Sequence, residues 1–444
     1  MQHVKKIILA SMVAMSVISS AEVNASAFQI WEQDEAGLGS AHSGGAAEAN
    51  SASTSYYNPA GMVRLDRPEM TTGIALIYPL VSFNGTLTRH VAGTALPPTQ
   101  LNNEQGGKKI LPVPNFHAVL PFEISGHKAA VGFSMVSVFD AFTDWADRGD
   151  PLENAADISS IKTVTAGPTF GFSVTDKFSI GAGVGVSYAF NEVSQGVDFG
   201  ATEFGYVDNN FSGFGVSGHV GVMYQFSEKT RVGVTYFSPI TYHMDGTSKG
   251  TTPIPSSKNV DTSQTWTFPE YVIASIFHNY EKFDFMGTVT WTHWSRIQSL
   301  QIESLVPDAG TNPIDHILKK EIVNINQKFK DTFAIMLGTN YHYSEKFTYK
   351  FGLGFDMSPT NDAARNLQLP DSNRLMASLG FQYRPFDDVI FDLGYMYVYA
   401  LPTTLNYTAP PGIKVMSTGI VKNDIKGDIN ASAHVFGAQL TLKF

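Results

Sequence analysis

Alternation between apolar and polar residues along the C-terminal segment constrains this chain more than any other feature. Five apolar residues occupy every second position there: Phe436, Ala438, Leu440, Leu442 and Phe444. Successive side chains of a β-strand point to opposite faces, so the segment predicts a strand with one apolar face. Residues 347–356 and 389–399 repeat the pattern. Because the other face is polar or rich in glycine in each case, the pattern predicts lipid outside and a wet lumen inside.

Short and long connections alternate along the chain between these segments. Short polar turns are expected at 125–127, 175–177, 227–229, 280–282, 344–346 and 385–388. Long loops rich in Gly, Pro, Asn and Thr are expected near 85–110, 140–160, 194–211, 244–262, 304–320, 359–371 and 402–428. The pattern predicts an all-β, antiparallel transmembrane barrel of about 14 strands over 69–444. The even number places both termini on the short-turn side, which is periplasmic in bacterial barrels.

The first 25 residues have the pattern of a secretory signal peptide. Two lysines precede Ile7, and the stretch from Ile7 to Ser20 is apolar with small residues. Val23 and Ala25 stand at the −3 and −1 positions, so we expect cleavage before Ser26. The alternative is a buried amphipathic helix. The apolar stretch is too short to span a bilayer, and no longer one follows it, so the remaining chain is expected to cross with strands.

Composition excludes several classes of protein and of site. Only 16% of the residues are charged, and the chain has 39 glycines and 31 phenylalanines. With no cysteine, neither a disulfide framework nor a thiolate metal site is possible. Histidines such as His293 and His342 show no metal-ligand spacing, so no metal and no cofactor are expected. A formal charge of −10 argues against nucleic acid as a partner.

Residues 26–68 do not alternate. They are mostly small and polar, but they also contain seven larger apolar or aromatic residues: Phe28, Ile30, Trp31, Leu38, Tyr56, Tyr57 and Met62. A flexible periplasmic tail is one interpretation. A plug folded into the lumen is the other, and it would explain the apolar residues, because a barrel of this width leaves an interior that wall side chains alone do not fill.

Ordered motifs along the whole chain resemble the FadL-type long-chain fatty acid transporters, a family that includes the toluene-type hydrocarbon channels. The motifs of the N-terminal part are Ser26-Ala27-Phe28-Gln29, Gly37-Leu38-Gly39, Ala41-His42-Ser43-Gly44 and Asn58-Pro59-Ala60. Those of the C-terminal part are Trp291–Ser295, Phe329–Phe333, Leu337–Thr339, Tyr341–Tyr343, Phe355–Pro359 and Leu369–Arg374. The terminal Phe444 resembles the aromatic residue through which outer-membrane assembly machinery recognises its clients.

The resemblance implies a monomeric barrel of fourteen strands plugged by an N-terminal hatch, here 26–68. It implies uptake of hydrophobic molecules without ATP or proton coupling. A groove between the third and fourth external loops, here 194–211 and 244–262, would meet the ligand first. An inward kink of the third strand, here 128–139, would open a sideways route from a lumenal pocket. Asn58, Pro59 and Ala60 match the hatch motif, although Asn-Pro also begins ordinary turns.

Two groups of residues are candidates for ligand binding. The loop candidates for docking are Phe199, Phe204, Tyr206 and Phe211; the alternative is that they only cover the barrel mouth. The candidates for a carboxylate anchor are Arg296, Lys328, Lys330 and Arg374. Alternation predicts that these cations lie on lumenal faces near the external end and outnumber nearby acids such as Asp356. The alternative is an ordinary lumenal ion-pair network.

The leading hypothesis is a passive outer-membrane channel for long-chain fatty acids, in contact with outer-membrane lipid and without enzymatic activity. A channel for aromatic or alkane hydrocarbons is the alternative in the same class. An outer-membrane lipolytic enzyme with Ser and His on the wall belongs to a different class, but nothing in the sequence pairs those residues. An adhesion barrel would need neither a plug nor an apolar pocket.

Overall fold

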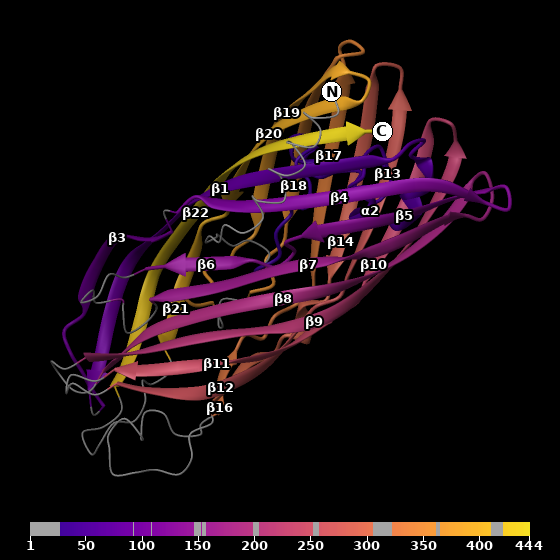
Figure 1. The fold of residues 1–444 in the computed structure, drawn as a ribbon. Helices are drawn as coiled ribbons and strands as arrows, with labels where there is room; N and C mark the ends of the chain where they lie inside the picture. Colours follow the sequence, from indigo (N-terminus) through magenta and orange to yellow (C-terminus); the bar gives the residue numbers. More distant parts are fainter. Residues whose placement is uncertain are drawn as a thin grey trace.

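A computed structural model gives the fold of this chain as a closed antiparallel barrel of fourteen strands (Figure 1). The structure describes residues 27–91, 93–107, 109–145, 152, 157–198, 204–251, 257–304, 322–360, 365–409 and 421–444. The predicted signal peptide therefore lies outside the described residues. Among those residues, no helix has both the length and the apolar character needed to cross a membrane.

Several of the fourteen strands consist of two β segments. In chain order they are β1 (Glu69–Val91), β3 (Thr99–Gly107) with β4 (Leu111–Ile124), β5 (His127–Val136) with β6 (Ala141–Asp144), β7 (Ile158–Ser173), β8 (Phe178–Asp198), β9 (Phe204–Ser227) and β10 (Thr230–Phe237) with β11 (Ile240–Thr251). The second half comprises β12 (Ser257–Phe268) with β13 (Tyr271–Tyr280), β14 (Phe283–Thr292) with β15 (Ser299–Ser304), β16 (Ile322–Asn326) with β17 (Thr332–His342), β18 (Phe347–Asp356), β19 (Arg374–Phe386), β20 (Val389–Ala400) with β21 (Thr403–Ala409), and β22 (Val421–Lys443). A short β2 (Thr94–Ala95) folds back on β1.

The first and last strands close the barrel. They pair without interruption from Glu69↔Lys443 to Val91↔Val421. The predicted faces are confirmed: Phe436, Phe351 and Leu393 are each more than half exposed on the outer wall. Their lumenal neighbours are covered, because the interior of this barrel is filled.

The interior is filled by residues 27–68, which we call the hatch. It contains the short helices η1 (Leu38–Ser40), α2 (Thr54–Tyr57) and η2 (Pro59–Arg64), and almost all of its side chains are buried. Glycines on the wall let the hatch backbone approach closely: a Cβ at Gly380 would lie 2.7 Å from the Gly39 Cα. The interpretation as a plug, rather than a flexible tail, therefore describes these residues.

The six short turns lie where the sequence predicts them, but several long loops are shorter than expected. β1 continues to Val91, β8 to Asp198 and β11 to Thr251, so much of the predicted loops 85–110, 194–211 and 244–262 is strand. The sequence pattern does not predict these extensions, because strands that continue beyond the bilayer no longer face lipid on one side. Their alternation is lost although their hydrogen bonding continues.

The third strand is interrupted in the middle. β5 ends at Val136 and β6 begins at Ala141. On one side β7 pairs with both parts. On the other side β4 pairs with β5 only as far as Phe116↔Met135, so in the described part of the chain Leu111–Asn115 pairs with β1 alone. We call the resulting interval between Leu111–Asn115 and residues 137–140 the wall gap.

Two prolines mark the open edge of this gap. Pro112 and Pro114 lie in the part of β4 that pairs only with β1. Proline has no N–H to donate to a ladder and is found in sheets mainly at edges and bulges. Their positions fit a strand that has an edge inside an otherwise closed barrel.

Candidate functional site

A cluster of aromatic side chains lies between the hatch and the wall gap. The Phe28 ring lies 4.9 Å from the Phe268 ring, 4.8 Å from the Trp294 ring and 6.1 Å from the Phe139 ring, measured between centroids. These four residues, which we call the aromatic cluster, come from the hatch, from residues 137–140, from β12 and from the 3₁₀ helix η3 (Trp294–Arg296). All are buried, so the cluster is an apolar core at the place where the wall is incomplete.

The hatch pairs with the interrupted strand from inside. The Ile30 N–H donates to the Val138 carbonyl (3.0 Å), and the Asp140 N–H donates to the Phe28 carbonyl (2.7 Å). Gln29 and Phe139 form an isolated antiparallel bridge. Residues 137–140 have thus exchanged β4 for the hatch as their backbone partner. Any movement of residues 28–33 would free the inner side of the wall gap.

Two small apolar cavities flank this hatch segment. One, of about 40 Å³, lies between hatch residues Gln29–Glu32 and strands β1, β19, β20 and β22. The other, of about 30 Å³, lies beside Tyr56, Phe237 and Tyr271. Each has room for about one or two water molecules. A hydrocarbon chain therefore enters either one only if hatch or wall side chains move.

Arg374 lies at the polar end of the first cavity. The guanidinium lies 3.3 Å from Asp356 and 3.9 Å from Asp371, and the side chain is 5% exposed. Its Nε and Nη2 atoms make no hydrogen bond to the described residues. The same two acids hold the hatch: Trp31 Nε1 donates to Asp356 (3.2 Å) and the Ala27 N–H to Asp371 (3.0 Å). Arg374 thus lies beside two acids that bind the hatch, and its Nε has no hydrogen-bond partner among the described residues.

The other three predicted anchors are placed differently. Arg296 binds Glu270 through two hydrogen bonds of 2.6 and 2.5 Å. Lys328 and Lys330 are exposed on either side of the buried Phe329. Alternation fails here because η3 and the irregular residues 327–331 interrupt the strands. The expectation of four lumenal cations in excess over acids is therefore wrong, since both arginines face carboxylates.

The predicted docking residues are only partly visible. Phe199 lies outside the described residues, and for Phe204 and Tyr206 only the backbone, in β9, is described. Phe211 belongs to β9 and is 1% exposed, in the core that also contains the aromatic cluster. The expectation that it projects from an external loop is wrong, because the strand extends past it.

The hatch motif forms a buried turn against the wall. Asn58 caps η2 by accepting a hydrogen bond from the Ala60 N–H (3.1 Å). Its amide donates to the Ala46 carbonyl (2.7 Å) and to the Val222 carbonyl of β9 (3.0 Å). Pro59 begins η2, and Ala60 is fully buried. Asn58 therefore ties two hatch segments to the barrel.

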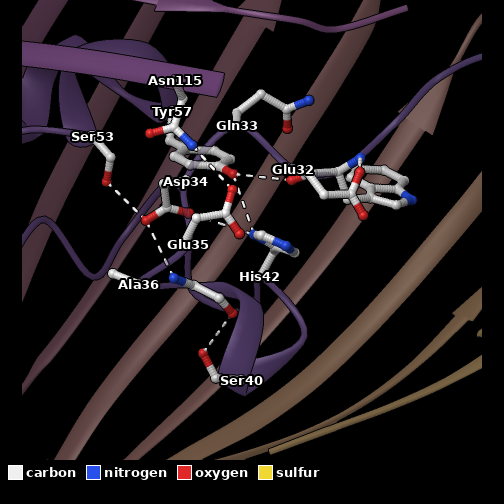
Figure 2. Close-up of polar contacts among 12 residues, drawn as sticks. Glu32, Gln33, Asp34, Glu35, Ala36, Ser40, His42, Ser53, Tyr57 and Asn115 are labelled. Atoms are coloured by element: carbon white, nitrogen blue, oxygen red, sulfur yellow. Dashed lines mark hydrogen bonds and ion pairs between the residues drawn. The ribbon is translucent and has the colours of Figure 1, made fainter. Parts of the chain in front are cut away.

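A run of buried acids continues from the hatch segment that covers the gap toward the short-turn end of the barrel. Glu32, Asp34 and Glu35, together with Glu48, form what we call the acidic hatch cluster. Asp34 accepts hydrogen bonds from the Gly37 N–H and the Ser53 hydroxyl, both at 3.2 Å, and lies 3.4 Å from His42 Nδ1 (Figure 2). The Asn115 amide donates to Glu35 Oε1 (3.1 Å), while Glu35 Oε2 has no hydrogen-bond partner among the described residues.

Burial and charge shift the acids of this cluster in opposite directions. Burial raises the pKa of Glu35 well above its usual range, and the charges of Glu32 and Asp34 raise it further. Burial also raises the pKa of Glu48, to about 7. For Asp34 burial is outweighed, because the hydrogen bond and charge of His42 and the nearby cations lower the pKa overall. Near neutral pH, part of the cluster is therefore protonated.

A polar vestibule of about 620 Å³ lies beneath this cluster, at the short-turn end of the barrel. Hatch residues Asp34, His42 and Glu48 line one side of it. On the wall side Lys350 donates to Asp392 (2.7 Å) and to the hatch carbonyl of Ala36 (2.8 Å). The roomy part of the lumen is thus charged, whereas the apolar part is tightly packed.

Two features of this arrangement are absent from the sequence-based predictions. The run Glu32-Gln33-Asp34-Glu35 stands in an otherwise weakly charged segment, and acids buried inside a plug need partners. The prolines at 112 and 114 occupy alternate positions of one strand, which is a signal of an open edge. Both signals are present in the sequence, but only the structure shows that the two features meet, because Glu35 accepts a hydrogen bond from Asn115 at the edge of the gap.

Comparisons with known proteins agree with this architecture. The family described as "Outer membrane protein transport protein (OMPP1/FadL/TodX)" matches residues 16–444. The long-chain fatty acid transport protein of Salmonella typhi is 25% identical over 431 residues, covering 89% of this chain and 92% of that protein.

Solved structures show the same fold. The crystal structure of a Pseudomonas aeruginosa FadL homologue has a TM-score of 0.82 at 20% identity and covers 94% of this chain and 100% of that one. The Pseudomonas putida toluene transporter TodX has a TM-score of 0.65 at 12% identity and covers 94% of this chain and 100% of that one.

Proposed function

The chain belongs to the OMPP1/FadL/TodX family of outer-membrane transport proteins for hydrophobic compounds, and we propose that within it the protein takes up long-chain fatty acids passively and releases them sideways through the wall gap. One observation carries the proposal. The aromatic cluster meets the wall exactly where a strand has lost its partner, and the hatch segment 28–33 covers that place from inside.

The polarity of the lumen favours a sideways exit over an axial one. Moving an apolar chain into water costs about 0.8 kcal/mol per CH₂ group. The axial path leads through the acidic hatch cluster and a vestibule lined by Lys350 and Asp392. The sideways path leads from the aromatic cluster through the wall gap to the lipid. A long hydrocarbon chain is therefore expected to leave through the gap.

Release through the gap requires the hatch to move. The hatch closes the wall gap through the backbone hydrogen bonds of Phe28 and Ile30 to residues 137–140 and through side-chain hydrogen bonds of Gln33 to Ser137 and of Glu35 to Asn115. A ligand that inserts beside Phe28 would compete with these contacts. Asn58 and Pro59 then serve as the fixed end of the hatch, since Asn58 is bonded to β9 and Pro59 packs against β7 and β8 while the N-terminal segment moves.

Arg374 is the remaining candidate for binding an acidic head group, which would compete there with Asp356 and Asp371. Of the four predicted cations, Arg374 is the one that lines an apolar lumenal cavity, and its Nε makes no hydrogen bond to a described residue. Arginine can bind a carboxylate through two hydrogen bonds. Neutral hydrocarbons, such as the toluene named for TodX, are the alternative substrates.

Uptake assays distinguish these substrates. Cells that lack their own transporter are supplied with this chain, and the uptake of oleate and of toluene is measured. We expect oleate uptake to depend on the chain and toluene uptake to change little. The reverse result would establish the hydrocarbon alternative, and dependence of neither would overturn the proposal.

The anchor role of Arg374 is tested by comparing oleate with methyl oleate. The affinities of both ligands are titrated in detergent for wild type, Arg374→Met and the control Arg296→Met. Loss of an anchor weakens the acid about tenfold or more and spares the ester. Loss of hatch packing alone would weaken both ligands equally and would contradict the anchor.

A further inference from the structure

An apolar groove lies on the lipid-facing side of the barrel, outside the lumen. Its volume is about 330 Å³, and its principal lining residues are Met70, Ala118, Leu120, Val131, Phe133 and Phe444. The one acid beside it, Glu69, is turned inward, where it is 1% exposed and bound to Lys443 at 2.9 Å. The side chains that line the groove therefore present a hydrocarbon surface.

The groove has a simple origin in the sequence. Ala118 faces outward from β4, and its strand partners are Met70 on β1 and Phe133 on β5. Along β4 its outward neighbours are Phe116 and Leu120. A methyl side chain surrounded by four large ones leaves a depression in the wall, and Phe444 extends one edge of it.

The position of the groove connects it to the wall gap. The last pair that closes β4 on β5 is Phe116↔Met135, and the next outward-facing pair is Ala118↔Phe133. Two residues of strand span about 7 Å, so the groove begins that far below the gap. It continues to Leu120 and Val131, toward the short turns and hence toward the periplasmic leaflet.

We propose that this groove is an exit site that receives the hydrocarbon chain of a transported molecule as it leaves the wall gap. The proposal rests on the sideways release described above. It commits to the transported ligand rather than a resident lipid, because the groove begins two residues below the gap on the same strands, β4 and β5, and lies on the side toward which the ligand must travel.

Filling the depression tests the proposal. Ala118→Phe adds an apolar ring on the lipid side, where it does not touch the lumen. The matched control is Ala182→Phe: Ala182 faces lipid on β8, between Phe170 and Val220, and does not line the groove. Oleate uptake per folded molecule should fall about fivefold in Ala118→Phe and stay unchanged in the control. Affinity for oleate in detergent should be the same in all three proteins.

Photo-crosslinking identifies the occupant. Membranes that contain the protein receive either a fatty acid or a phospholipid, each with a diazirine at the chain end. Adducts of the transported acid at Phe133 or Phe444, reduced in Ala118→Phe, support the exit site. Adducts from the phospholipid alone would show an annular lipid site and overturn it.

Three further outcomes are decisive. Equal uptake by Ala118→Phe and wild type would overturn the exit site while leaving sideways release standing. A lower amount of folded Ala118→Phe in the outer membrane, with normal uptake per molecule, would assign the groove to assembly instead. Absence of oleate uptake by wild type would overturn the proposed function and the exit site with it.

Discussion

The two sides of the hatch are built on opposite principles. The aromatic cluster beside the wall gap is apolar and tightly packed, and the apolar cavities around the hatch measure only about 30 and 40 Å³, although Gln33 and Glu35 also hydrogen-bond to residues of the gap. The side that faces the periplasm is charged and open, with a vestibule of about 620 Å³. The open volume inside this barrel is charged, so it does not indicate the route of a hydrophobic ligand. We expect a hydrophobic ligand to follow the apolar contacts beside the wall gap, where hydrogen bonds join the hatch to the interrupted strand.

The largest expected effect comes from breaking the polar side. Lys350→Met leaves the buried Asp392 without its cation and removes a donor to the Ala36 carbonyl. Removing one partner of a buried ion pair costs about 3–5 kcal/mol. We expect a clear loss of thermal stability, and faster hydrogen exchange around Ala36. The double variant Lys350→Met with Asp392→Leu should recover most of the stability; if it is no better than the single variant, the ion pair does not hold this side.

A somewhat smaller effect is expected on the apolar side. Phe28→Ala removes the ring at the centre of the aromatic cluster, and such truncations cost about 3 kcal/mol or more. Because the barrel itself is unaffected, the loss should appear as faster hydrogen exchange at residues 28–33 and faster basal uptake. Exchange around Ala36 should stay unchanged. Equal loosening of both sides would show that the hatch moves as one unit and would remove the distinction between them.

The smallest expected effect is that of pH on the stability of the docked hatch, through its buried acids. The docked hatch binds protons more tightly than the free hatch at Glu35 and Glu48, because burial raises both pKa values. A raised acid pKa stabilises the docked form at low pH, and this stabilisation is lost as pH rises from the ordinary value near 4.5 to about 7 for Glu48. Asp34, with its lowered pKa, has the opposite sign, but only in more acidic solution.

Hydrogen exchange of the hatch as a function of pH, corrected for the intrinsic rate, measures this linkage. Opening should increase between pH 5 and 8 by at most about tenfold per unit for one group. Glu48→Gln should flatten the profile, whereas Glu345→Gln, on the exposed turn that borders the same vestibule, should not. An identical profile in wild type and Glu48→Gln would exclude Glu48 as the group responsible.

The sequence predicts the barrel well and the hatch contacts poorly, for physical reasons. The alternation of Phe436 to Phe444 follows from lipid on one side, a constraint that acts on every strand alike. Arg296 lies in a 3₁₀ turn that breaks this alternation, so its partner Glu270 could not be inferred from parity. Gln439 faces the lumen as predicted, but the hatch covers it. Its side chain accepts a hydrogen bond from the Glu35 N–H (2.9 Å). Such contacts join residues hundreds of positions apart, and no local pattern encodes them.

The most direct test of the central claim, that hatch residues 28–33 gate a sideways exit, is a reversible lock between the hatch and the interrupted strand. Gln29 and Phe139 are an antiparallel pair, and such pairs have Cα separations within the range of a disulfide. The chain has no cysteine of its own, so Gln29→Cys with Phe139→Cys introduces a single possible bond. Oleate uptake by this variant is compared in its oxidised and reduced forms, in proteoliposomes. We predict at least a tenfold lower rate when the bond is formed and recovery on reduction. Equal rates in the two forms would contradict the gate.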